Sequence, residues 1–255
     1  MALFSPLNLP HGILLLITDG LAAPADFVLH RCLATHLKEN NKKSRTVILS
    51  VSENISRWKA LASKSNLSLQ QHLDSGSVDF IDVLAEVQPP AGKVDDAGSA
   101  PAFQAIFKRV QDILNKNHQE GNGSGPALVI LDDITMLEWI GFPLLEVTRF
   151  ARALGATCAK ANATLLIRHH VVGGSNDDVD DLFRHLVQIC TYHLEVRPLA
   201  SGRSGTVSGE VALHPGFSAP CSNTVKMIPR SAALQYRLTD SGPDFFAKGT
   251  SENVL

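Results

Sequence analysis

A turn near the N-terminus has the position, though not the residues, of a phosphate-binding loop. P-loop proteins carry the pattern G-x-x-x-x-G-K-[ST] directly after a buried strand, and its backbone N–H groups and lysine hold the phosphates. Here only the first glycine, Gly20, is present, while Ala25, Asp26 and Phe27 replace the second glycine, the lysine and the magnesium-binding hydroxyl. At 4 Å and an effective dielectric near 20, exchanging a cation for a carboxylate turns about 4 kcal/mol of attraction to phosphate into repulsion. We therefore expect a structural strand-to-helix turn that does not hold ATP in the usual way.

A second nucleotide-like pattern lies in the middle of the chain, where the apolar residues 128–131 are followed by Asp132 and Asp133. In nucleotide hydrolases, carboxylates at the end of such a strand sit by magnesium or polarise a water molecule. Buried strands also end in aspartate for a structural reason, because the carboxylate caps the following turn. Without the lysine and hydroxyl partners we favour the structural role. The pair of patterns indicates a fold that was kept after its chemistry was lost.

The elements that would position these residues alternate along the first three quarters of the chain. Apolar runs without polar interruption are typical of strands buried on both faces of a parallel sheet, and apolar residues at i, i+3, i+4 and i+7 indicate amphipathic helices. Strands are predicted at residues 13–17, 46–51, 78–84, 127–131 and 164–169, and helices around residues 29–37, 55–62, 103–114, 143–161 and 179–187.

Beyond Cys190 the pattern changes to short strand-like pieces without helices between them. Such pieces, separated by Gly, Pro and Ser, indicate antiparallel strands, here at residues 192–197, 209–213, 224–228 and 234–238. The whole order predicts an α/β fold: a RecA-like ATPase core with a mostly parallel central sheet, antiparallel C-terminal strands and a degenerate P-loop. A generic doubly wound domain has the same order of elements. The positions of the two nucleotide-like patterns therefore decide in favour of the RecA-like core. We expect one domain over residues 1–255, with flexible loops at 88–101 and 117–126.

The amino-acid composition limits which partners and which cellular compartments we expect for the chain. A formal net charge of −2 gives no global basic field, so any contact with nucleic acid needs a local patch or basic neighbours. The four cysteines are scattered without a C-x-x-C pair, which favours free thiols in a reducing compartment. The first ten residues lack a basic leader region, and the apolar run at 13–17 is too short to span a membrane. We expect a soluble protein of the cytoplasm, with the nucleus as a second location and no membrane contact.

At this point the chain resembles the Elongator complex protein six family, one of three related RecA-fold families of the Elongator accessory ring. The resemblance rests on the lysine-free turn after residues 13–17, the strand with carboxylates at 128–133 and, most specifically, the C-terminal residues 245–251. It runs from about residue 6 to residue 255. It implies a heterohexameric ring with Elongator subunits four and five that binds tRNA and supports wobble-uridine modification by the catalytic Elongator subunits. It also implies no nucleotide cofactor and no catalytic role.

The alternative is a nucleotide-hydrolysing enzyme with an atypical site, which Asp132 and Asp133 keep open. The discriminating residues are Asp26 and Phe27, since they remove the cation and the magnesium ligand. A third reading is a protein scaffold with no RNA contact of its own. No arrangement of a nucleophile with a histidine and an acid suggests itself in the sequence, and we expect no metal.

By analogy with RecA-like rings, residues 136–143 and 171–181 line the pore and are positions for RNA contact. Trp139 and Phe142 in the first segment can stack on a base or pack at a protein interface. The second segment repels phosphate and suits a helix N-terminus better, because it carries Asp177, Asp178, Asp180 and Asp181.

Two further groups of residues are candidates for a ring interface. Arg168 and His169 come at the end of a predicted strand, followed by His170, and neighbouring residues on a strand point to opposite faces, which disfavours a shared metal. Phe245 and Phe246 follow the last predicted strand, together with Lys248. On an extended segment one phenyl ring can pack on its own sheet while the other is presented to a neighbour.

Overall fold

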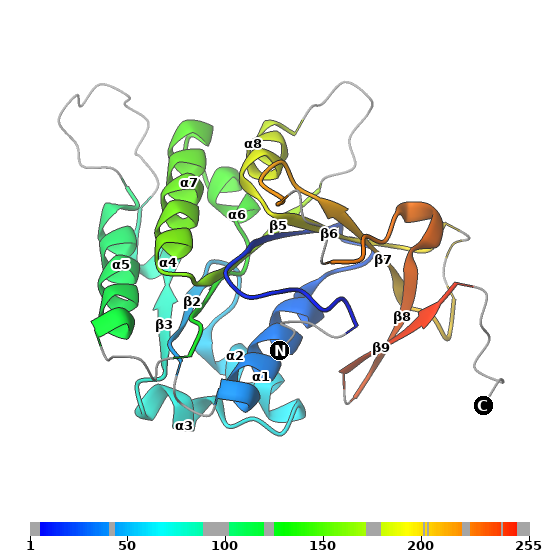
Figure 1. Cartoon of the computed structure of the whole chain (residues 1–255), viewed down its shortest axis with the longest axis horizontal. Helices are drawn as coiled ribbons and strands as arrows, with labels where there is room; N and C mark the ends of the chain where they lie inside the picture. Colours follow the sequence, from blue (N-terminus) through cyan, green and yellow to red (C-terminus); the bar gives the residue numbers. More distant parts are fainter. Residues whose placement is uncertain are drawn as a thin grey trace.

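The computed structural model describes residues 6–40, 44–88, 102–119, 125–171, 180–200, 202, 204–220, 225–240 and 242–248. The described residues form a nine-stranded sheet in the order β3-β2-β4-β5-β1-β6-β7-β8-β9 (Figure 1). Residues 89–101 and 120–124, within the predicted flexible loops 88–101 and 117–126, lie outside the described residues, as do Asp177, Asp178 and one of the four cysteines, Cys221.

Six parallel strands form the larger part of the sheet. The apolar runs of β1, β2 and β4 have no solvated face, because each of their positions is buried. The strands are β1 (Leu14–Asp19), β2 (Thr46–Ser50), β3 (Val78–Asp82), β4 (Leu128–Leu131), β5 (Thr164–His170) and β6 (Tyr192–Arg197).

Helices cover both faces of the parallel strands, as Figure 1 shows. Neighbouring strand residues enter different cores: Leu15 and Ile17 pack with α1 and α2, whereas Leu14 and Leu16 pack with α5, α7 and α8. The described helices are α1 (Asp26–Asn40), α2 (Ile55–Lys64), α3 (Leu69–Asp74), α4 (Val83–Glu86), α5 (Gln104–Gln119), α6 (Thr135–Trp139), α7 (Leu144–Lys160) and α8 (Asp181–Ile189), with a short 3₁₀ helix at Arg230–Ala232.

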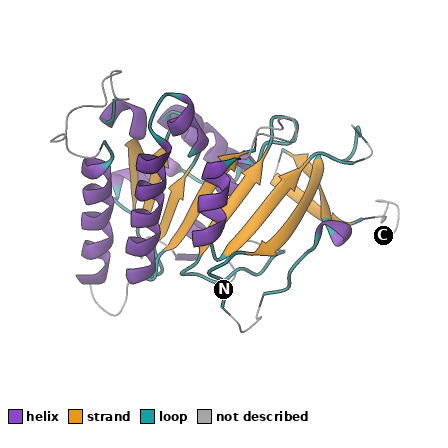
Figure 2. Cartoon of the chain, turned by 90° about the horizontal axis from the view of Figure 1, so that it is seen from above, coloured by secondary structure: helices purple, strands orange, loops and turns teal. Residues whose placement is uncertain are grey.

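Three antiparallel strands extend the sheet beyond β6, namely β7 (Gly209–Pro215), β8 (Leu234–Thr239) and β9 (Gly242–Ala247). Viewed from above, this end of the sheet projects past the helices (Figure 2). Gly242 has a φ of +131° at the start of β9, a backbone conformation that side chains other than glycine rarely adopt. Because β9 is the last strand in the order of the sheet, the hairpin β8–β9 forms one end of the molecule.

The structure corrects several sequence predictions in this part of the chain. β6, predicted as antiparallel, pairs in parallel with β1, and only its other edge is antiparallel. Of the strand predicted at 224–228, the described residues form a single bridge between Ile228 and Leu213. The segment with Phe245 and Phe246 is itself a strand, β9, because it pairs with β8 along its whole length.

The third strand was predicted two residues too long. Asp82 accepts a hydrogen bond from the backbone N–H of Ala85 and thereby caps helix α4, which takes Val83 and Leu84 out of the strand. Helices α3 and α6 were not predicted, because each is too short to show a helical period.

Three of the cysteines are buried and free, namely Cys32, Cys158 and Cys190. Burial raises the pKa of each of their thiols to about 12, which makes them unreactive packing residues. Within the described parts of the chain, no helix is both long and apolar enough to cross a membrane.

Candidate functional site

The turn between β1 and α1 lies where a P-loop would hold phosphates, and its backbone is already engaged. The N–H of Ala23 donates to the carbonyl oxygen of Gly20 at 3.0 Å, which closes a tight turn with Leu21 exposed at its tip. The N–H of Ala25 donates to Oδ2 of Asp19 at 2.5 Å. An amide of the kind that binds phosphate at a helix N-terminus thus already faces a carboxylate of its own chain.

Arg168, at the end of β5, links this turn to the neighbouring strand. Its Nε donates to Oδ2 of Asp19 at 3.0 Å, and its Nη1 donates to Oδ1 of Asp26, the residue in the lysine position of the motif. The guanidinium side chain is 5% exposed, so the charge is withdrawn from solvent and held between two carboxylates. The phosphate position is therefore occupied by an ion pair of the protein itself.

His170 completes this network from the same face of β5. Its Nδ1 lies 2.5 Å from Oδ1 of Asp19, and its Nε2 lies 3.3 Å from Oδ2 of Asp133. Hydrogen bonds to Asp133 and Asp19 raise the pKa of His170 to about 9, against the opposing effects of burial and of Arg168, whose Nη2 is 3.1 Å from Nε2. A protonated imidazole cannot accept a hydrogen bond from the Arg168 guanidinium. The carboxylates of Asp19 and Asp133 therefore favour the protonated form of His170. We call Asp19, Asp26, Asp133, Arg168 and His170 the edge network.

The two carboxylates after β4 point to different neighbours. Asp132 is 1% exposed and accepts hydrogen bonds from the Ser50 hydroxyl and from the N–H groups of Val51 and Ser52. Burial raises the pKa of Asp132 to about 6, although these hydrogen bonds lower it. Oδ1 of Asp133 accepts from the N–H of Thr135, at the start of α6. Asp133 therefore caps the turn that follows β4, whereas Asp132 binds the backbone that follows β2 and does not cap its own turn.

His169 points away from the edge network and connects three elements. The Thr135 hydroxyl, which accepts from the N–H of His170 at 2.7 Å, lies 2.9 Å from Nδ1 of His169. Nε2 of His169 lies 2.6 Å from Oδ2 of Asp180, whose other oxygen accepts from the N–H of Phe183 and caps α8. Both ring nitrogens of His169 therefore have a hydrogen-bonding partner within the chain. Asp180 thus marks a helix N-terminus, as expected for this acidic segment.

These observations correct the roles that we expected for two strand-end residues. Arg168 is 4% exposed and His169 is 1% exposed, so their side chains belong to the interior and are not presented at a ring interface. Phe142 is also buried, with its ring 4.7 Å from that of Phe103, and is not available to stack on a base. Trp139 is 53% exposed and stacks on the imidazole of His170 at 6.4 Å, which leaves it at the surface beside the edge network.

The C-terminal candidates lie on the outer hairpin. The ring of Phe245 is 6.5 Å from that of Phe27 and 6.3 Å from that of Tyr236, so it packs toward α1. Phe246, the next residue along β9, is half-buried and lies outside both core clusters. Nζ of Lys248 is 4.0 Å from Oε2 of Glu210. Phe27, expected only as the replacement of a hydroxyl, therefore anchors the hairpin.

Motif comparison did not identify Asp19 or the role of His170. The pattern directs attention to residues 20–27, while Asp19 is the last residue of the strand that precedes them. The available signal was weak: Asp19 and Arg168 both come at the carboxyl ends of strands, where side chains from adjacent parallel strands meet. Within the described segments, no group of His, Cys, Asp and Glu side chains has the arrangement of a metal site.

Comparisons with known proteins agree over nearly the whole chain. Residues 2–240 match the family described as Elongation complex protein 6. Proteins called Elongator complex protein 6 from Danio rerio and Homo sapiens are each 24% identical, over 266 and 263 residues, covering 98% of this chain and 96% of the relative. A KaiC-like protein from Pyrococcus horikoshii superposes with a TM-score of 0.61 at 8% identity, covering 93% of this chain and 90% of that chain. Its RecA-like architecture confirms the predicted fold class.

Proposed function

Because the chain belongs to the Elongation complex protein 6 family, we propose that it is a subunit of the Elongator complex and catalyses no reaction itself. The resemblance found in the sequence is thereby confirmed at the level of the family. The fuller proposal is that it joins subunits four and five in the hexameric accessory ring. There it supports tRNA binding and the modification of the wobble uridine by the catalytic subunits.

The observation that carries the non-catalytic role is the edge network. Arg168 lies between Asp19 and Asp26 at the place where a lysine and backbone amides would meet phosphate. A nucleotide would have to displace a buried ion pair while meeting the carboxylates of Asp19, Asp26 and Asp133. Asp132, which supported the alternative of an atypical hydrolase, is engaged by the residues that follow β2. The network therefore favours a protein that keeps the fold for assembly.

Weak tRNA binding by the isolated chain is part of the proposal. The chain has a net charge of −2, and binding to the phosphate backbone depends on the number of cations brought to it. Exposed Trp139 offers one aromatic ring for stacking, which is insufficient without a basic surface. Affinity is expected to come from the assembled ring, where neighbouring subunits add the cations.

Two measurements on purified protein test the proposal. Isothermal calorimetry of the isolated chain with ATP and magnesium should show no binding, and tight magnesium-dependent binding would support the hydrolase instead. In the second, the chain is combined with subunits four and five, and its mass and its affinity for tRNA are measured at physiological salt. We expect a hexamer that binds tRNA more tightly than the chain alone. Failure to form a complex, or sub-micromolar tRNA binding by the lone chain, would contradict the proposed role.

A further inference from the structure

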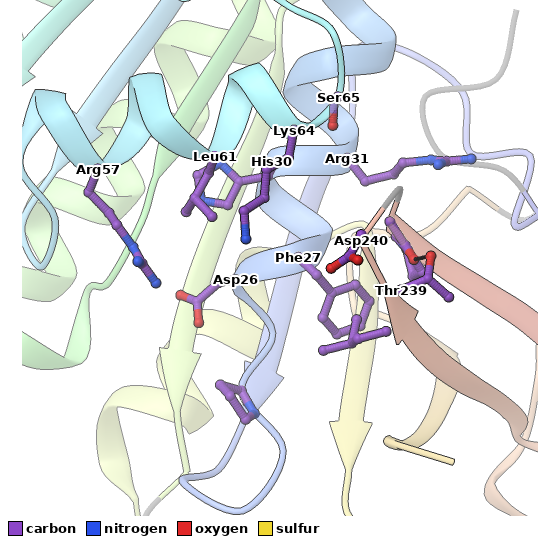
Figure 3. Close-up of a pocket in the computed structure, with 14 residues that line it drawn as sticks. Asp26, Phe27, His30, Arg31, Arg57, Leu61, Lys64, Ser65, Thr239 and Asp240 are labelled. Atoms are coloured by element: carbon purple, nitrogen blue, oxygen red, sulfur yellow. Dashed lines mark hydrogen bonds between the residues drawn. The ribbon is translucent and has the colours of Figure 1, made fainter. Parts of the chain in front are cut away.

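A groove of about 280 Å³ lies between helices α1 and α2 and the tip of the hairpin β8–β9. Figure 3 shows it from the side, with Arg57 and Lys64 extending from α2 toward Asp26 at the start of α1. The wall opposite α2 is formed by Thr239, Asp240 and other residues around the hairpin tip. The groove is separate from the edge network and shares only Asp26 with it.

Three cations line this groove, and the residues that the structure describes offer them little compensation. Arg31 and Lys64 form no ion pair with any other described residue. Among the described residues Arg57 pairs with Glu53, four residues earlier in the sequence; its Nε is 4.0 Å from the carboxylate oxygen and its side chain is 59% exposed. Surface ion pairs of this kind contribute little and exchange readily with other partners. The groove therefore holds three cationic side chains that remain available to a ligand.

The carboxylates of the groove do not cancel this charge. Asp26 forms an ion pair with the buried Arg168, which compensates its negative charge from the interior of the protein. Asp240 remains as one exposed carboxylate at the hairpin tip. The pKa of His30, on the floor, is lowered to about 4 by burial and then by Arg57 and Arg168, so the imidazole is neutral. The net excess of positive charge thus comes from Arg31, Arg57 and Lys64.

The rest of the lining is apolar. Leu238 is 46% exposed on β8, and Phe27, Leu61, Pro24 and Pro243 contribute carbon surface. Cations arranged beside exposed apolar side chains match a peptide that carries both carboxylates and apolar residues. We propose that this groove is a docking site for an acidic, partly apolar segment of another protein.

The alternative occupant, the phosphate backbone of RNA, fits less well. Asp240 lies among the cations and would repel phosphates. A peptide can place a backbone N–H beside Asp240 and its carboxylates beside the cations. The aromatic ring of Phe27 is packed at 4.6 Å on Tyr236 and is not free to stack on a base.

The test is a fluorescence anisotropy titration of the full chain with a labelled short peptide of alternating glutamate and leucine. The wild-type chain should bind this peptide, and Arg57→Glu and Lys64→Glu should each weaken binding about tenfold because attraction becomes repulsion. Lys59→Glu is the matched control, since Lys59 lies on the same helix and does not line the groove. It should change the affinity by less than about twofold. Denaturation curves would verify that each variant is folded.

Three results would overturn the proposal. These are absence of peptide binding by the wild-type chain, an equal loss of affinity in Lys59→Glu, and displacement of the peptide by single-stranded oligouridine at lower concentrations than by unlabelled peptide. The last result would assign the groove to nucleic acid. None of these outcomes bears on whether the chain assembles with subunits four and five, so this proposal and the proposed function fail separately.

Discussion

At the carboxyl edge of β1 and β5, Arg168 and His170 lie between carboxylates of the chain, whereas around the hairpin β8–β9 the cations Arg31 and Lys64 have no ion pair with a described residue. The first region has the sequence positions of a nucleotide site. The second carries neither of the two nucleotide-like sequence patterns. The second region combines cations that have no ion pair among the described residues with the exposed side chain of Leu238, and a binding partner can use both properties.

This difference shows that the sequence positions of a nucleotide site can be engaged by contacts within the chain itself. Asp132 and Asp133 stand where a hydrolase has its carboxylates, but each accepts hydrogen bonds from backbone within its own chain. Arg168 places a cation beside the position where a P-loop has its lysine, and this cation binds the carboxylates of Asp19 and Asp26. Retained acidic residues therefore indicate function only when their neighbours leave them accessible.

The largest effect is expected from Arg168→Met, which would break the edge network. The substitution leaves the carboxylates of Asp19 and Asp26 without their shared cation, and Asp19 is fully buried. Removing one partner of a buried ion pair costs about 3–5 kcal/mol of unfolding free energy. Urea denaturation followed by circular dichroism measures the loss.

Two further variants sharpen this prediction. Arg184→Met removes an arginine that is 62% exposed and 3.8 Å from Asp181, and it should change stability by less than about 0.5 kcal/mol. Adding Asp26→Asn to Arg168→Met should recover part of the loss, since one uncompensated charge is removed. If Arg168→Met is no more harmful than Arg184→Met, the network does not hold this edge of the fold.

The next effect is a pH dependence that comes from His170. Its folded pKa is raised to about 9, above the usual 6.5, so its contribution to stability is complete below pH 6.5 and is lost as pH rises through 9. The full contribution is at most about 3 kcal/mol. Unfolding free energy measured between pH 6 and pH 9 should fall for the wild type and fall less for His170→Gln. Equal slopes for the two proteins would mean that the carboxylates do not hold a protonated imidazole.

Sequence reasoning identified the fold class and most elements of the parallel half because those signals are local. A continuous apolar run such as β4 specifies a strand buried on both faces, and the period of α7 specifies its amphipathic helix. The partners of Arg168 could not be inferred, because Arg168 and Asp19 are 149 residues apart in the sequence and meet only in the folded chain. The groove was missed for the same reason, since its walls come from α1, α2 and the final hairpin.

A third effect separates the two phenyl groups of β9. Phe245 packs with Phe27 and Tyr236, so Phe245→Ala should lower the unfolding free energy by about 2 kcal/mol. Phe246 lies outside both core clusters, and Phe246→Ala should cost less than about 1 kcal/mol while weakening association with subunits four and five about tenfold. Thermal denaturation and sedimentation analysis of the mixed subunits measure both properties. If folded Phe246→Ala associates normally, the outer face of β9 is not an interface.

The smallest effect is expected from Lys248→Ala at the end of the same strand. Lys248 is 52% exposed and its Nζ is 4.0 Å from Glu210, a carboxylate that already accepts a hydrogen bond from Nη2 of Arg197 at 2.6 Å. Because Glu210 is buried and satisfied without Lys248, the substitution should change the unfolding free energy by less than about 0.5 kcal/mol. Arg197→Ala is the comparison, since it removes the close partner and should cost about 1–3 kcal/mol. Urea denaturation of both variants measures these two changes in unfolding free energy. A loss in Lys248→Ala as large as that in Arg197→Ala would make Lys248 part of the folded network, and its charge would then not be available to a neighbouring subunit.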